Sequence, residues 1–325
     1  MNLTILATIC IVTMFYIHIV FHLKTSDDLE VFEIPTLSRD HLEDVCNYRQ
    51  PIVFQHQDDQ LNLCTPTHLK HYAAFDVCVY DAKYEGIPLT LEEALPLFPA
   101  KSYATYNNQT FLNDTMAKKF FVSMDTLLRP PMVSTITYDV LFGHTGYTTR
   151  MAYSTYYRNY YYVSSGSITM KLTPPRNTRY LQEVKKYDTQ EFYTNFNPWT
   201  DTLKKVKCIE IVVPQGSMVF IPAYWWYSIR LEKEACVCSI QYKTFMNLVA
   251  TLPSLCMGVL QRQNTKVKVL PTYSLAKDEP DTESRTSEDR PPPPSHLPPS
   301  SCCPAASEEK TLHTPPAQDT CTENP

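Results

Sequence analysis

The stretch that decides the fold is residues 216–227, which read Gly-Ser-Met-Val-Phe-Ile-Pro-Ala-Tyr-Trp-Trp-Tyr. A turn at residues 214–216 opens a strand of apolar residues. Pro222 ends the regular pairing of that strand, because proline cannot donate to a ladder of hydrogen bonds. The next strand begins in the aromatic run and carries Tyr227, which we expect to point into the interior. This stretch therefore predicts two consecutive strands of an antiparallel β structure.

Further β segments surround this stretch, and two segments have helical patterns. Short runs of β-branched and aromatic residues between turns are typical of a sandwich or barrel. A helix is predicted at residues 89–98 with Thr90 as its N-cap, and another at 245–263 with an interruption near Pro253. The predicted β segments are residues 49–55, 76–82, 138–143, 159–172, 208–213, 217–223, 225–231 and 235–242.

The first residues of the chain have the composition of a membrane anchor. Residues 3–23 contain no Asp, Glu, Lys or Arg, and about 20 such residues span a bilayer core as a helix. A cleaved signal peptide and a buried helix are the rival interpretations. The chain has neither the basic start nor the small-residue cleavage site of a signal peptide. We therefore predict a single-pass membrane protein anchored through residues 3–23.

The side of the membrane on which the main domain lies is less well marked. The cysteines of the folded part are irregularly spaced, which favours reduced thiols and a cytosolic domain. Two sequons, at Asn108 and Asn113, argue for the other side, because they would be glycosylated in a lumenal domain. We expect the cytosolic side.

Composition excludes several classes of function. The net charge is -5 without a long basic block, so nucleic acid is not an expected partner. The chain has no Cys-x-x-Cys pair, which makes a zinc site unexpected. It also lacks the Gly-x-Ser-x-Gly elbow and the phosphate-binding P-loop.

A second motif identifies the family that the chain resembles. Asn159 is followed after six residues by Gly166, and the strand after it leads to Pro174 and Pro175. Together with residues 216–227, this spacing resembles the two motifs of cupin-like, JmjC-type domains. The resemblance covers roughly residues 30–265 and extends to a membrane-anchored group of such proteins. It implies a mainly β, double-stranded β-helix (jelly-roll) barrel with flanking helices.

The family's metal-binding residues are replaced in this chain. Active relatives hold iron(II) with two histidines and a carboxylate, and they bind 2-oxoglutarate. The corresponding metal positions are Tyr153, Thr155 and Tyr227, and the position of the cosubstrate lysine is Ile168. Protonated tyrosine is a poor iron(II) ligand, and no histidine lies between residues 145 and 295. We therefore expect no cofactor, although a tyrosinate that binds oxidised iron remains the alternative.

Tyrosines crowd the first motif, and two interpretations of them stay open. They fill a barrel that no longer holds metal, or they form an aromatic pocket for a peptide, sugar or small ligand. Asn159, Tyr161 and Trp226 are the candidate residues that would line such a pocket.

These observations predict three parts and one function. Residues 1–25 form the anchor, 30–270 the cupin-like domain, and 277–325 a disordered tail rich in Pro, Ser and Thr. We expect a non-catalytic binding or structural module at a membrane, with an unknown protein or small molecule as its partner. The alternative is a relative of the iron and 2-oxoglutarate hydroxylases with residual or altered activity.

Overall fold

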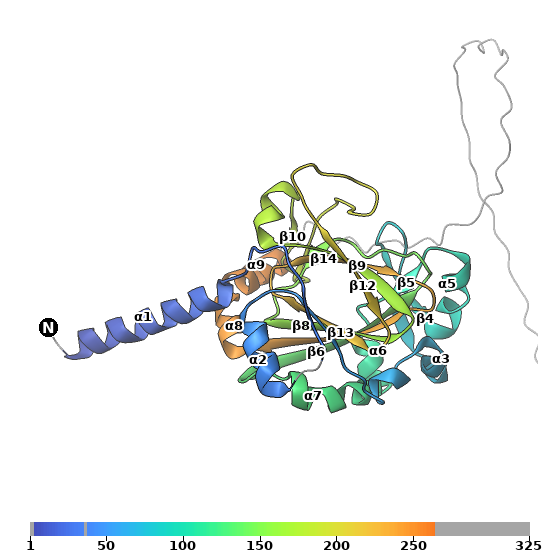
Figure 1. Cartoon of the computed structure of the whole chain (residues 1–325), viewed down its shortest axis with the longest axis horizontal. Coiled ribbons are helices and arrows are strands. Elements are labelled where there is room, and N and C mark those ends of the chain that lie inside the picture. The colour runs from blue at the N-terminus through green and yellow to red at the C-terminus, as the bar shows by residue number, and fades with distance from the viewer. Residues whose placement is uncertain (1–2, 36–37, 264–325) are drawn as a thin grey trace, which may run out of the picture. The chain divides into compact units, whose positions relative to one another are not determined.

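The computed structural model describes residues 3–35 and 38–263, and the predicted tail at 277–325 lies outside them. Figure 1 shows two β-sheets with helices around them. The α-helices are α1 Leu3–Leu23, α2 Arg39–Asn47, α3 Pro66–Leu69, α4 Leu91–Ala94, α5 Leu97–Ala100, α6 Gln109–Asp114, α7 Val122–Leu128, α8 Phe245–Ala250 and α9 Leu252–Gln263. The strands are β1 Phe32–Ile34, β2 Ile52–Gln55, β3 Asp76–Tyr80, β4 Gly86–Thr90, β5 Ala104–Thr105, β6 Val133–Gly143, β7 Ala152–Tyr153, β8 Arg158–Ser165, β9 Ser167–Thr173, β10 Val184–Lys186, β11 Glu191–Tyr193, β12 Ile209–Pro214, β13 Ser217–Pro222, β14 Trp226–Leu231 and β15 Cys236–Thr244.

The strands form two sheets whose inner faces pack together. The larger sheet has nine strands in the order β1-β2-β13-β8-β15-β6-β5-β3-β4, and the smaller has six in the order β10-β11-β7-β14-β9-β12. One buried cluster joins them, with Val163 and Val219 from the larger sheet and Met170 and Ile229 from the smaller. The expected mainly β jelly-roll with flanking helices is confirmed.

The alternation of side chains in β8 explains where the tyrosines go. Tyr161 and Val163 lie between the sheets. Tyr160 and Tyr162 point to the other face of the larger sheet, where they join the core under the helices that precede β6. Tyr160 and Tyr162 therefore fill the core under the helices, and Tyr161 remains between the sheets.

Glycines make two turns, the one predicted at residues 214–216 and one within the predicted β segment 159–172, which the structure divides into β8 and β9. Gly166 joins β8 to β9 with φ +67°, and Gly216 precedes β13 with φ +76°. Both values lie in the left-handed region, which favours glycine. A Cβ at Gly166 would also lie 2.5 Å from the backbone oxygen of Lys233, so this hairpin packs closely on the β14–β15 turn.

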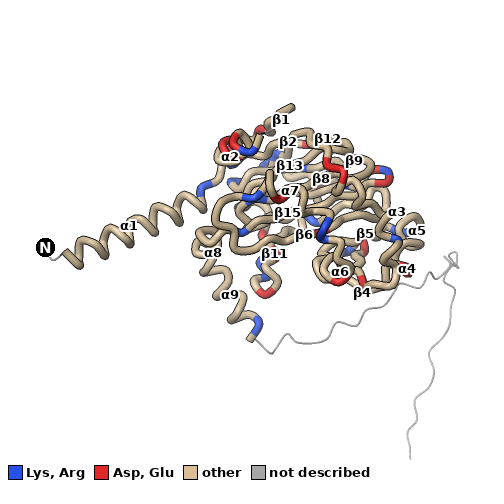
Figure 2. Tube along the Cα trace, turned by 90° about the horizontal axis from the view of Figure 1, so that it is seen from below, with Lys and Arg blue, Asp and Glu red and all other residues tan. Residues whose placement is uncertain are grey.

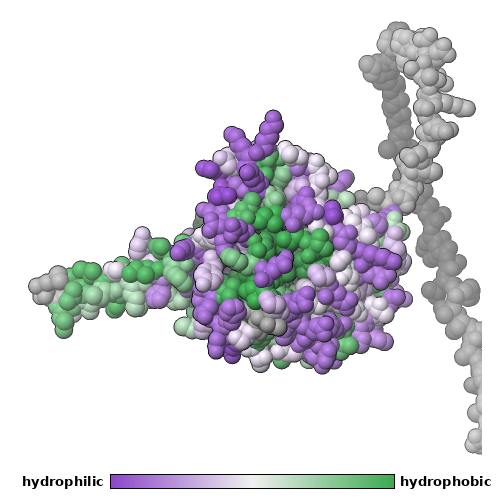
Figure 3. Space-filling model, viewed as in Figure 1, coloured by the Kyte–Doolittle hydropathy of each residue, from purple (hydrophilic) through white to green (hydrophobic). Residues whose placement is uncertain are grey.

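The predicted C-terminal helix is interrupted as expected, whereas the helix predicted at residues 89–98 forms only as two short helices, because residues 89 and 90 end β4. Thr90 caps α4 in a capping box with Glu93, and Pro96 separates α4 from α5. The predicted C-terminal helix is divided at Thr251 into α8 and α9. Helix α1 is long and apolar enough to cross a membrane, and none of it is buried in the domain; Figure 3 shows apolar side chains along it.

Candidate functional site

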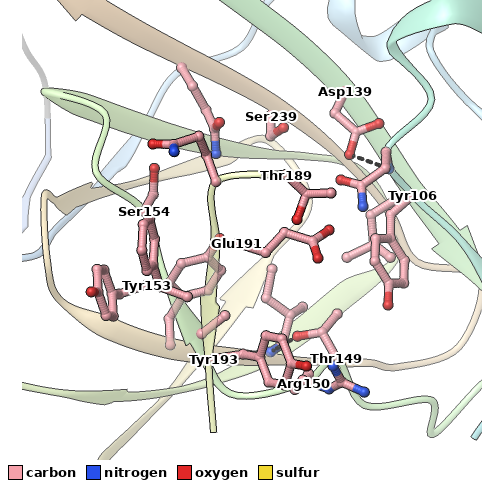
Figure 4. A pocket seen from close by; sticks show the side chains of 18 of the residues that line it. Tyr106, Asp139, Thr149, Arg150, Tyr153, Ser154, Thr189, Glu191, Tyr193 and Ser239 are labelled. Atoms are coloured by element: carbon pink, nitrogen blue, oxygen red, sulfur yellow. Dashed lines mark hydrogen bonds between the residues drawn. The ribbon is translucent and has the colours of Figure 1, made fainter. Parts of the chain in front are cut away.

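A cavity of about 640 Å³ opens between the two sheets. Its walls come from β6, β8 and β15 of the larger sheet and from β7, β11 and β14 of the smaller. Figure 4 shows side chains from both sheets around this space, among them Asp139 of β6, Ser239 of β15 and Glu191 of β11. Its lining is rich in tyrosine and in uncharged polar residues, among them Tyr80, Tyr106, Tyr156, Tyr193, Thr137, Thr189, Ser239 and Gln241.

Buried Tyr161 and partly buried Tyr227 form a hydrogen-bonded pair in the cavity wall. The Tyr161 hydroxyl donates to the Tyr227 hydroxyl at 2.7 Å and accepts from the Gln241 side-chain amide at 3.3 Å. Burial raises the pKa of Tyr161 and of Tyr227 above their usual value. Both phenols are therefore neutral at physiological pH, and the pair offers hydroxyl groups rather than phenolates.

Asp139 places a carboxyl group in the same cavity. Its oxygens accept hydrogen bonds from the backbone N–H groups of Asn107 at 2.8 Å and Asn108 at 2.6 Å; the dashed line in Figure 4 marks a bond of this carboxylate. Burial nevertheless raises the pKa of Asp139 to about 6, because the loss of water around the charge outweighs these bonds. The group can therefore change protonation near physiological pH.

Arg150 supplies a cation at the rim of the cavity. Its guanidinium lies over the rings of Tyr193, at 4.0 Å, and Tyr84, at 4.8 Å, and one of its N–H groups donates to the Lys83 carbonyl at 3.4 Å. Among the described residues it makes no ion pair. Glu191, on β11, points into the same space in Figure 4. The cavity thus presents positive and negative groups among aromatic rings.

The predicted metal positions do not converge on one face of a sheet. Tyr227 pairs with Ala152 across β14 and β7, whereas Tyr153 pairs with Trp226. Directly paired residues share a face, so the rings of Tyr153 and Tyr227 point to opposite sides of the smaller sheet. Tyr153 borders the cavity, but its ring stacks on Phe192 and its hydroxyl donates to Glu183.

The other two predicted positions, Thr155 and Ile168, lie in different parts of the domain. Thr155 borders the cavity and is buried. Ile168 is fully buried between the sheets and pairs with Leu231, four residues along β14 from Tyr227, which is about 13 Å at the usual rise of a strand. The cosubstrate position is therefore remote from the cavity wall formed by Tyr227.

Of the three candidate lining residues, one lies in the cavity. Tyr161 is part of the wall, whereas Asn159 and Trp226 do not line it. Trp226 neighbours Tyr227 in the strand, so it faces the other side, where its indole N–H donates to the Thr178 hydroxyl at 2.8 Å. Asn159 is fully buried, and its amide donates to the carbonyl of Ile221 at 3.0 Å.

The residues present do not fit a site made of two histidines and one carboxylate. None of the residues that line the cavity is a histidine. Within residues 3–35 and 38–263, no group of three His, Cys, Asp or Glu side chains is arranged to hold a metal ion. The lining instead suits hydrogen bonding and ring stacking with an organic ligand.

Part of the domain matches a known protein family. Residues 100–246 match the model of a family described as a cupin-like domain. No curated protein matches the chain.

Proposed function

The chain carries a cupin-like domain, and from this premise we propose that it is a membrane-anchored, non-catalytic binding module. The observation that carries the proposal is the cavity between the sheets, with the Tyr161–Tyr227 hydroxyl pair in its wall. In this proposal the cavity holds a small polar ligand, such as a sugar, an amino acid or a short peptide.

The chemistry of the lining supports this class of ligand. Tyrosine rings offer flat apolar surfaces, while their hydroxyls and the Gln241 amide offer donors and acceptors. The Tyr161 hydroxyl already donates to Tyr227, so the proton of the Tyr227 hydroxyl has no acceptor among the described residues. A ligand oxygen can accept it.

A ligand screen on the full chain tests the proposal. Saturation-transfer NMR is measured with monosaccharides, free amino acids and dipeptides at millimolar concentration. Ala152→Trp fills the cavity beside Tyr227, and Val212→Trp, on the exposed edge strand β12, is the matched control. We expect compounds that bind the wild type and Val212→Trp but not Ala152→Trp. Absence of any binder, or equal binding by Ala152→Trp, would overturn the ligand-binding function.

We also propose that the anchor is α1 and that the domain lies in the cytosol. All cysteines of the described residues are free. Asn108, the acceptor of one sequon, is 2% exposed, and its amide nitrogen donates to the Thr105 hydroxyl at 2.8 Å and to the Val140 carbonyl at 3.2 Å. A glycan would replace one of the two N–H donors on that nitrogen and would need space that a 2% exposed side chain does not have, so the fold suits a compartment without glycosylation.

Cell fractionation and glycosidase treatment test the anchor and its orientation separately. Carbonate extraction should leave the protein with the membranes, and deletion of residues 1–25 should release it. Glycosidase treatment should leave its mobility unchanged. A mobility shift that Asn108→Gln or Asn113→Gln abolishes would place the domain in the lumen.

An enzyme is the second candidate function, and Asp139 favours it. A carboxyl group in a cavity with a pKa raised to about 6 is suited to accept and return a proton at neutral pH. Asp139→Asn would then abolish turnover of a bound compound but leave its affinity nearly unchanged, whereas a binding module shows no turnover in either form.

A further inference from the structure

Helices α8 and α9 expose a line of apolar side chains. Phe245 and Val249 of α8 and Leu252 and Val259 of α9 are between 37% and 56% exposed, and Cys256 between the last two is exposed as well. The spacing of these five residues alternates between four and three positions, which places them along one side of each helix. We call this set the outer stripe.

The opposite side of α9 is the polar one, and it packs on the domain. Gly258 is buried, and a Cβ there would lie 2.4 Å from the carbonyl oxygen of Tyr187. The Gln261 side chain accepts from the Tyr187 N–H at 2.9 Å, and Arg262 donates to the Asp188 carbonyl at 2.7 Å. A surface helix of a water-soluble domain has the reverse arrangement. The orientation of α9 is therefore the one that suits an apolar environment on its outer side.

The anchor helix indicates what that environment is. Helix α1 packs against α8, and its last turn is attached to the domain through Arg49. This buried guanidinium lies 5.2 Å from the ring of Phe21 in α1 and 4.7 Å from the ring of Tyr157. His22 also stacks on Tyr157, with 5.3 Å between the ring centres. The point where α1 leaves the membrane is thus next to α8.

Charge is scarce along these helices. Figure 2 shows α1 and α8 without a charged residue and α9 with one basic residue near its end, which is Arg262. The outer stripe is apolar and lies next to α1, and α9 carries Arg262 near its end. This combination suits the boundary between lipid headgroups and acyl chains.

We propose that the outer stripe of α8 and α9 lies in the membrane interface beside α1, so that the domain rests on the lipid surface with a fixed orientation. The lipid bilayer, rather than a second copy of the chain, is the occupant, because the stripe begins on the helix that contacts α1. This inference rests on the proposed anchor, and the experiment separates the two.

Three tryptophan variants of the full chain are reconstituted in phosphatidylcholine vesicles with and without bromine on the acyl chains. Leu260 is 60% exposed and lies four residues after Cys256, on the same side of α9 as the outer stripe. Leu260→Trp therefore reports on the outer stripe, Ile11→Trp on α1, and Val212→Trp on the exposed strand β12. The native tryptophans are common to all three, so the wild type is subtracted. We expect bromine to reduce the added emission of Leu260→Trp and Ile11→Trp and to leave that of Val212→Trp unchanged.

Each other outcome overturns a different statement. Quenching of Ile11→Trp without quenching of Leu260→Trp would reject the interfacial stripe while the anchor stands. Lack of quenching at Ile11→Trp would reject the anchor itself. Cross-linking of native Cys256 between two copies by a bismaleimide, with Leu260→Trp unquenched, would show that a second chain covers the stripe.

Discussion

Replacing Ala152 and Tyr227 together by histidine should create a nickel site between β7 and β14. The two residues are direct partners in antiparallel register and both line the cavity, so their Cβ atoms lie about 5 Å apart. Imidazole is a good ligand for Ni²⁺, and Asp139 offers a carboxylate in the same cavity. Tyr153→His with Tyr227→His is the matched control, because Tyr153 faces the side of Trp226.

The gain in stability on nickel binding follows from the thermodynamic linkage between binding and folding. An ion that binds only the folded state, at about 100 times its Kd, stabilises that state by about 2.7 kcal/mol. For a domain of this size, Tm should rise by about 5–10 °C. Thermal unfolding of the full chain is measured with nickel, without it, and after addition of EDTA. An equal rise in the control pair, or no rise in a folded Ala152→His, Tyr227→His variant, would refute the assignment of faces.

Three further predictions concern stability. Tyr227→Phe should lower the free energy of unfolding by roughly 1–3 kcal/mol, because the buried Tyr161 hydroxyl loses its acceptor; urea unfolding that matches the wild type would contradict this. Burial raises the pKa of Asp139 from 3.8 to about 6, so between these pH values the folded chain keeps a proton that the unfolded chain has lost. Stability should therefore fall by up to about 3 kcal/mol as pH rises through this range, and urea midpoints of Asp139→Asn should lack that component. Gly166→Ala should destabilise the fold more than Gly216→Ala. Both positive φ values cost an L-residue about 1–2 kcal/mol. Only at Gly166 does the new Cβ meet backbone at 2.5 Å, which adds roughly 1–3 kcal/mol. Equal losses in chemical denaturation would show that this hairpin can relax.

The fold was predictable because its signals are local. Residues 216–227 predict a turn, a strand that ends at Pro222 and a second strand, and these are Gly216, β13 and β14. The alternation of side chains between the two faces of β8 and the break in the C-terminal helix near Pro253 likewise depend on a few neighbouring residues. Side-chain periods and turn residues determine such elements without knowledge of the rest of the chain.

The site was predictable only in part, because its geometry depends on the irregular segment between β7 and β8. Counting back from Asn159 to Tyr153 crosses the segment between β7 and β8, where the Tyr156 N–H bonds to the Ser154 hydroxyl instead of a strand partner. A shift of one residue in a strand exchanges its two faces, so a motif count does not determine which face Tyr153 occupies.

Asp139, Arg150 and Glu191 were not foreseen as site residues, since nothing in their local sequence brings them together. Asp139 lies on β6, Arg150 precedes β7, and Glu191 begins β11. One signal was present: Asp139 stands in the otherwise apolar and aromatic run 138–143 of a predicted strand. An acid in such a run is buried at a cost, and a functional position is one reason for it.

The proposed non-catalytic function is tested most directly by supplying iron(II), 2-oxoglutarate and oxygen. The full chain is incubated without oxygen with iron(II) and 2-oxoglutarate, bound iron is measured after desalting, and oxygen is then admitted while succinate is followed by mass spectrometry. We expect no iron retained in stoichiometric amount and no succinate above a protein-free blank, because the cavity presents the Tyr161–Tyr227 pair and no histidine. Stoichiometric iron with succinate release, both lost in Tyr227→Phe, would contradict the proposed function and would make the cavity the centre of an oxygenase.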